Sequence, residues 1–241
     1  MYLSFFVSLL SFSPLSSLVG AQIILDRQCW HEFPLETSNI LSLPSGYQEL
    51  AIPVHFRPNA VTSWSHPVIC TEVLQSINDK LCVYTSTEFA ADRGISIFTT
   101  PALAQQFLSL LAFRDQAALA KVNTPTNTYH AASIPNKGMG MLATRPLGFG
   151  DVITSYTPAF IAYLESELGT MEREKIWRTA IEQLPRKIRE EFLGLSYVYG
   201  DERVRVQDIV KGNTFQLEVG GVNHLAIWPE TSRANHACNP K

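Results

Sequence analysis

Hydrophobic positions recur at helical spacing in three stretches of the chain. Thr100 and Pro101 form a helix start, because threonine is a good N-cap and proline suits the first helical position. The pattern predicts a helix over residues 102–121 and two more over 172–184 and 186–195, separated by Pro185. The first of these helices is expected to bury an apolar face made of Leu103, Phe107, Leu110 and Leu111. The second presents Ile176, Trp177, Ala180, Ile181 and Leu184 on one side.

Short runs with strand character lie between and after these helices. They cover residues 130–134, 139–145, 151–156, 214–219 and 222–228, and the first three are separated by glycines. Gly220 and Gly221 separate the last two runs and predict a tight hairpin. Residues 93–101 are interpreted as a strand that leads into the first helix, and 22–67 as an irregular segment. The order of elements predicts an α+β fold of small sheets with a helical insert.

The composition is that of a globular protein. The 241 residues are 46% hydrophobic and 17% charged, enough for one large domain or two small ones. The formal net charge is −3, and no run of five or more lysines and arginines occurs. Binding to nucleic acid through phosphate contacts is therefore not expected. The charged run over residues 172–175 is interpreted as a solvated helix face, and His224 as a sheet residue without chemistry.

The first 21 residues predict a secretory signal peptide. They carry no charge, hold an apolar run that is too short to span a bilayer, and end in the small-residue sequence Val19-Gly20-Ala21. Cleavage after Ala21 would place Gln22 at the mature N-terminus and direct the protein to the secretory pathway or the extracellular space. The alternative is an N-terminus without this role, on a nuclear or cytoplasmic protein.

The four cysteines are Cys29, Cys70, Cys82 and Cys238. No CxxC pair occurs, so no structural zinc site is expected. In a secreted chain Cys70 and Cys82 could form a disulfide worth about 3 kcal/mol through loop entropy. Two buried thiols are the equally weighted alternative. His236 and Cys238 lie two residues apart, but a metal site is not expected because no third ligand is close in the sequence.

Two segments carry a resemblance to a known family. Lys137-Gly138-Met139-Gly140 opens the sequence KGMGMLATRPL, which is followed by Gly150-Asp151-Val152-Ile153, and ANHACNP covers residues 234–240. In this order the two segments resemble the opening strand and the core motif of the SET domain, the fold of most protein-lysine methyltransferases. The helices and the hairpin between them resemble the branch of the family that carries an insert. The resemblance covers residues 128–241 and implies an N-terminal region over 22–127.

The resemblance implies S-adenosylmethionine as cofactor and a protein lysine as substrate. Glycine lets the backbone approach a ligand closely, while asparagine and histidine offer hydrogen-bonding groups. By resemblance, the cofactor-binding residues are Lys137, Gly138, Met139, Gly140, Asn235 and His236.

SET domains continue beyond the core motif into a segment that supplies the catalytic tyrosine. Here Lys241 follows Pro240 and ends the given sequence, so no tyrosine is assigned a catalytic role. Tyr197 and Tyr199 precede the motif and do not correspond to it. The expectation is a SET-domain protein that is truncated after the motif, with weak or no cofactor binding and no methyl transfer. The alternative is a secreted, disulfide-containing binding or structural module without enzymatic activity.

Overall fold

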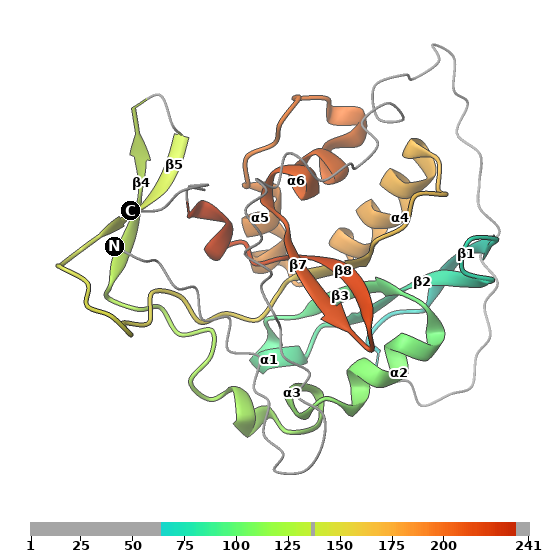
Figure 1. The fold of residues 1–241 in the computed structure, drawn as a ribbon, viewed down its shortest axis with the longest axis horizontal. Coiled ribbons are helices and arrows are strands. Elements are labelled where there is room, and N and C mark those ends of the chain that lie inside the picture. Colours follow the sequence, from blue (N-terminus) through green and yellow to red (C-terminus); the bar gives the residue numbers. More distant parts are fainter. Residues whose placement is uncertain (1–63, 136–137, 235–241) are drawn as a thin grey trace.

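The structure is a computed structural model that describes residues 64–135 and 138–234. The predicted signal peptide, Lys137, Asn235, His236, Cys29 and Cys238 lie outside the described residues. The described part is a mixed α+β fold with a six-stranded sheet and a separate two-stranded hairpin (Figure 1). Among the described residues, no helix is long and apolar enough to cross a bilayer.

The large sheet has the strand order β1-β2-β3-β6-β8-β7. Neighbouring strands are antiparallel, except that β3 and β6 are parallel. The sheet therefore joins strands from before and after residue 128. Its strands are β1 (Ile69–Leu74), β2 (Asp79–Ser86), β3 (Ile95–Thr99), β6 (Phe160–Tyr163), β7 (Phe215–Val219) and β8 (Val222–Ile227). The predicted run 93–101 thus contains a central strand, β3.

Helices cover both faces of this sheet, as Figure 1 shows. One face packs against α4 (Thr170–Glu182), α5 (Arg186–Leu193) and α6 (Arg205–Asn213). The other packs against α2 (Pro101–Ser109) and the short turns α1 (Phe89–Asp92), α3 (Leu111–Arg114) and η3 (Gln116–Leu119). A hydrophobic core lies on each face of the sheet, and alternate residues of β3 contribute to the two cores: Phe98 to the first and Ile97 to the second. The whole strand is therefore buried.

Several local predictions are confirmed. The Thr100 side chain accepts a hydrogen bond from the Leu103 backbone N–H, and Pro101 is the first residue of α2. Pro185 separates α4 from α5, and the predicted apolar face of α4 is buried. Gly220 and Gly221 have φ of 59° and 77°, the left-handed conformation that a tight hairpin between β7 and β8 needs.

The predicted helix over residues 102–121 is wrong beyond Ser109. Leu110 has a ψ of 145°, so α2 ends there and the chain continues as α3 and η3. Leu110 and Leu111 are 41% and 42% exposed and do not belong to the core face. The Ser109 hydroxyl donates to the Gln106 carbonyl, a local bond that competes with helix continuation.

The predicted strand over residues 151–156 is also wrong, because this segment joins no ladder. Its backbone is held by side chains instead: the Thr126 hydroxyl donates to the Ile153 carbonyl. Asp151 closes the preceding turn by accepting from the Gly148 N–H and from Arg145. The other two runs form the hairpin of β4 (Tyr129–Ile134) and β5 (Gly138–Ala143).

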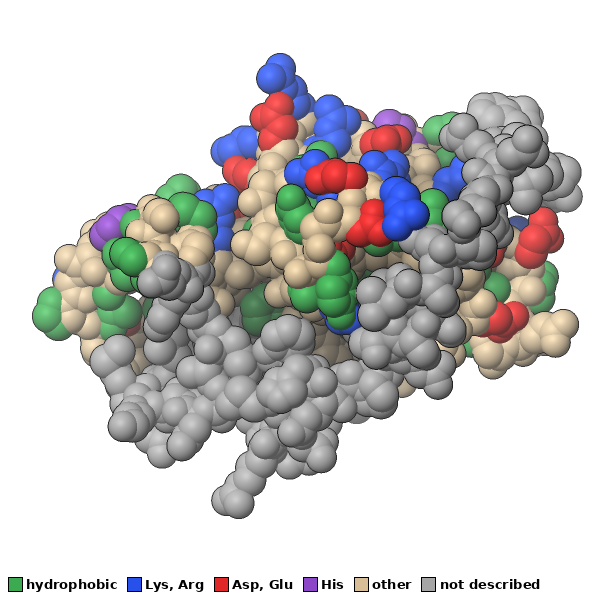
Figure 2. Space-filling view, turned by 90° about the horizontal axis from the view of Figure 1, so that it is seen from above, with side chains coloured by type: hydrophobic (Ala, Val, Ile, Leu, Met, Phe, Trp, Pro, Cys, Tyr) green, Lys and Arg blue, Asp and Glu red, His purple; other side chains and the backbone are tan. Residues whose placement is uncertain are grey.

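The charged run at the start of α4 is not a uniformly solvated face. Glu172 and Lys175 are exposed, but Glu174 is only 2% exposed. Its carboxylate lies against the start of α6, which follows the short turn η4 (Glu202–Val204). Seen from the side of α4–α6, Figure 2 shows basic and acidic side chains interspersed. Exposed pairs such as Arg186 and Glu190 add little stability.

Candidate functional site

The first predicted cofactor segment lies on β5. Gly138 has a φ of 73°, a left-handed conformation that favours glycine, and a Cβ built there would meet no atom within 4 Å. Met139 is 46% exposed, whereas Gly140 is buried. Glycine at 138 is therefore required by backbone conformation, and the space beside it is open.

β5 lies beside η5 (Thr231–Arg233), the short turn that follows β8. Arg233 is two residues before Asn235, the first of the predicted cofactor residues in the second segment. The fold thus brings Gly138, Met139 and Gly140 near the part of the chain that leads into Asn235 and His236. These two residues and Lys137 lie outside the described part, so their contacts are not part of this geometry.

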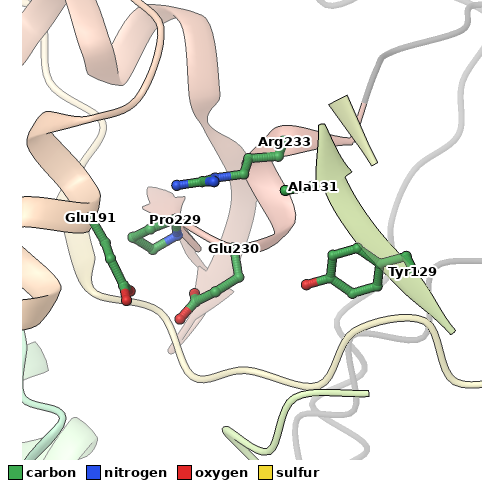
Figure 3. Close-up of a pocket in the computed structure, with 6 residues that line it drawn as sticks. All are labelled: Tyr129, Ala131, Glu191, Pro229, Glu230 and Arg233. Atoms are coloured by element: carbon green, nitrogen blue, oxygen red, sulfur yellow. The ribbon is translucent and has the colours of Figure 1, made fainter. Parts of the chain in front are cut away.

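A cavity of about 170 Å³ opens between the β4–β5 hairpin, α5 and η5. Figure 3 shows the side chains that line it: Glu191 from α5, Tyr129 and Ala131 from β4, and Pro229, Glu230 and Arg233 around η5. The walls combine two carboxylates, one guanidinium and one phenol with small apolar surfaces. None of the lining residues was assigned to a site from the sequence.

Arg93 holds Glu230 in place beside this cavity. Its two terminal nitrogens donate to the two carboxylate oxygens at 2.6 and 2.8 Å, and Nη2 also donates to the Thr157 carbonyl. Both side chains are largely buried, at 12% and 17% exposure. A bidentate geometry of this kind fixes direction as well as charge. The guanidinium carbon of Arg93 lies 5.5 Å from the centroid of the Tyr156 ring.

A left-handed turn positions Arg93. Ala90, Ala91 and Asp92 have φ of 56°, 57° and 62°, a conformation that costs non-glycine residues about 1 kcal/mol or more each. The surrounding packing maintains it: Phe89 and Ala90 are buried in the core beneath the sheet. This turn also lines a second cavity, of about 400 Å³, whose wall includes Lys187 and Glu191. Glu191 therefore lines both cavities.

Glu191 has an unsatisfied oxygen beside the cavity. Its Oε2 is buried and has no hydrogen-bond partner. Burial raises the pKa of the Glu191 carboxyl, and the neighbouring Glu230 carboxylate raises this pKa further, while Arg93 and Lys187 oppose the rise. A buried carboxylate oxygen without a partner is costly, so this atom can gain from a donor in the cavity.

Two tyrosines complete the polar cluster. Tyr129 and Tyr156 lie close enough for each side chain to influence the pKa of the other. Burial, followed by the negative charges that Tyr129 and Glu230 can carry, raises the pKa of Tyr156 to about 12. Burial also raises the pKa of Tyr129. Both phenols are therefore neutral at physiological pH and serve as hydrogen-bonding groups rather than as bases.

Sequence reasoning missed this cluster because its members are distant along the chain. Arg93 and Glu230 are 137 positions apart, and neither belongs to a local motif. Within residues 64–135 and 138–234, no group of three histidine, cysteine, aspartate or glutamate side chains is placed to hold a metal ion. Comparisons of the sequence with protein-family models, with curated proteins and with solved structures found no match.

Proposed function

We propose that residues 128–241 form a weak S-adenosylmethionine-binding region of the SET type, a fold whose chemistry is methyl transfer to a protein lysine. The observation that supports this most is the position of β5 beside η5. β5 carries the first of the two segments that resemble the cofactor motifs of that family, and η5 ends at Arg233, one residue before the second segment begins. The left-handed Gly138 and the buried Gly140 fit a backbone that a ligand approaches closely.

In this proposal the cofactor supplies the methyl group, and the chain supplies its binding surface. Gly138, Met139 and Gly140 offer backbone groups along β5, and Lys137, Asn235 and His236 are the proposed partners outside the described residues. The substrate amine must be neutral to react, yet lysine in water has a pKa near 10.4. Binding must therefore remove water from the amine and orient it toward the methyl carbon.

Photo-crosslinking of radiolabelled S-adenosylmethionine to the full chain tests the proposal. We expect weak but saturable labelling that S-adenosylhomocysteine displaces. Asn235→Ala should reduce this labelling at least tenfold, which corresponds to about 1.4 kcal/mol. Asn223→Ala is the matched control, because Asn223 is exposed on β8. Labelling that does not saturate, or that both variants retain, would refute the proposed cofactor site.

A second candidate function has its own structural support. Cys70 and Cys82 face each other on β1 and β2 and form a disulfide with a Cα–Cα distance of 3.9 Å. A disulfide is typical of proteins from oxidising compartments, which favours a secreted binding or structural module without enzymatic activity. Thiol alkylation and N-terminal sequencing of protein from culture medium test this. An oxidised pair with Gln22 at the N-terminus, together with no cofactor labelling, would favour the second candidate.

A further inference from the structure

The cavity beside η5 holds one carboxyl group with an unpartnered oxygen and one guanidinium without an ion pair among the described residues. Arg93 neutralises Glu230 through the bidentate pair, which leaves Glu191 as the acidic group and Arg233 as the basic group of the cavity wall. Arg233 is half-buried and forms no ion pair with any side chain in the described ranges. Figure 3 shows the guanidinium of Arg233 and the carboxylate of Glu191 flanking Pro229, with the Tyr129 hydroxyl directed toward Glu230 from the opposite wall.

This charge arrangement discriminates among ligand classes. A cation without a carboxylate would be attracted by Glu191 but would face the positive charge of Arg233. An anion without an amine would be attracted by Arg233 but would lie beside the acidic Glu191. A zwitterion offers a carboxylate to Arg233 and an ammonium to Glu191, which is the complementary arrangement in a partly desolvated cavity. The ammonium would also favour the ionised form of Glu191, which burial and the Glu230 carboxylate disfavour. An ammonium near Glu191 would also supply the donor that its buried Oε2 lacks.

The size of the cavity restricts the ligand further. An engineered protein cavity of about 150 Å³ holds one benzene molecule, so about 170 Å³ suits a ligand of comparable size. Ala131 and Pro229 offer small apolar surfaces that a short aliphatic side chain can contact. We propose that this cavity binds an α-amino acid, with its carboxylate on Arg233 and its ammonium on Glu191.

This inference does not rest on the proposed function. The α-amino-acid group could come from a free amino acid or from the methionine end of S-adenosylmethionine, since both carry the same zwitterion. Titration calorimetry of the full chain should therefore use L-methionine, S-adenosylmethionine and two single-charge analogues. The analogues are 3-(methylthio)propylamine, which lacks the carboxylate, and 4-(methylthio)butanoate, which lacks the amine.

We expect L-methionine to bind and each single-charge analogue to bind at least tenfold more weakly, because each loses one ionic contact. Arg233→Gln and Glu191→Gln should each weaken L-methionine binding at least tenfold. The matched controls are Arg203→Gln and Glu190→Gln, which change exposed side chains and should leave binding unchanged. Urea denaturation of each variant separates loss of binding from loss of folding.

The inference is overturned if neither L-methionine nor S-adenosylmethionine shows binding that the Arg233 and Glu191 variants weaken, or if either analogue binds as tightly as L-methionine. Binding of S-adenosylmethionine that weakens in the Arg233 and Glu191 variants would identify the cofactor as a source of the zwitterion. Binding of S-adenosylmethionine that both variants retain, with no binding of L-methionine, would refute this site and leave the proposed function standing. Binding of L-methionine alone would support this site and count against the cofactor proposal.

Discussion

The Glu174 carboxylate joins two helices that are separate in the sequence. It accepts hydrogen bonds from the backbone N–H groups of Val206 and Gln207 in the first turn of α6, at 3.1 and 3.0 Å. The residue before α6, Val204, has no side-chain acceptor with which to cap that helix. Glu174 therefore satisfies donors that a helix N-terminus leaves unpaired, and its negative charge suits the positive end of the helix dipole.

At the scale of single residues, we predict that Glu174→Ala lowers the free energy of unfolding by about 2–3 kcal/mol, because two buried N–H groups lose a charged acceptor. Glu174→Gln keeps one acceptor oxygen and should lose less. Urea denaturation of the oxidised protein measures both. Glu172→Ala, two residues away on the exposed side of α4, is the control and should change stability by less than about 0.5 kcal/mol. An equal effect of Glu174→Ala and Glu172→Ala would contradict the capping role.

At the scale of elements, α2 shows how a short helix is fixed by its buried side. Leu103, Ala104 and Phe107 are buried, and Phe107 is only 2% exposed. Its ring packs edge-on against Phe113 and against the buried His224 of β8. Beyond Ser109 the chain turns, so Leu110 is directed away from this contact region. The boundary of the helix therefore decides which apolar residues reach the core.

We predict that Phe107→Ala lowers the free energy of unfolding by about 3–5 kcal/mol, because it leaves a cavity between α2 and the sheet. Leu110→Ala should cost less than about 1 kcal/mol, since Leu110 is 41% exposed. The two variants remove large apolar side chains three residues apart and control for each other. If thermal and urea unfolding gave similar losses for both, Leu110 would be a core residue and the boundary of α2 would be misplaced.

At the scale of the whole molecule, the central sheet connects distant segments of the chain. β3 and β6 are parallel neighbours in the sheet, although the β4–β5 hairpin lies between them in the sequence. β8 pairs with the other side of β6. At the β1 edge, the Cys70–Cys82 disulfide ties the outermost strand to its neighbour. Cys82 is fully buried, so this bond also belongs to the core beneath the sheet.

Replacing both cysteines by alanine should lower the free energy of unfolding by about 3 kcal/mol. The bond spans 12 positions, and a crosslink of this length restricts the unfolded chain by about that amount in the loop-entropy model. Urea denaturation with and without a reductant measures the effect. The reductant should destabilise the wild-type protein and leave the double variant unchanged. Equal behaviour of the two proteins under oxidising conditions would show that the pair is not bonded in solution.

The sequence by itself determined the features that depend on a few adjacent residues. Thr100 and Pro101 start a helix, Pro185 ends one, and Gly220-Gly221 forms a tight turn, because each effect acts through local backbone geometry. The apolar face of α4 followed from its spacing for the same reason. The resemblance of two segments to the SET family also came from the sequence, and it stays a proposal.

Only the tertiary structure decided the partners of individual side chains. Charge alone predicted a solvated Glu174, but the N-terminus of α6 makes its burial favourable. Hydrophobicity alone predicted a buried Leu110, but the end of α2 exposes it. The pairing of Arg93 with Glu230 depends on β3, β6 and β8 lying side by side. Such pairings are set by which strands neighbour each other, and that choice depends on the free energy of the whole packed sheet rather than on any local segment.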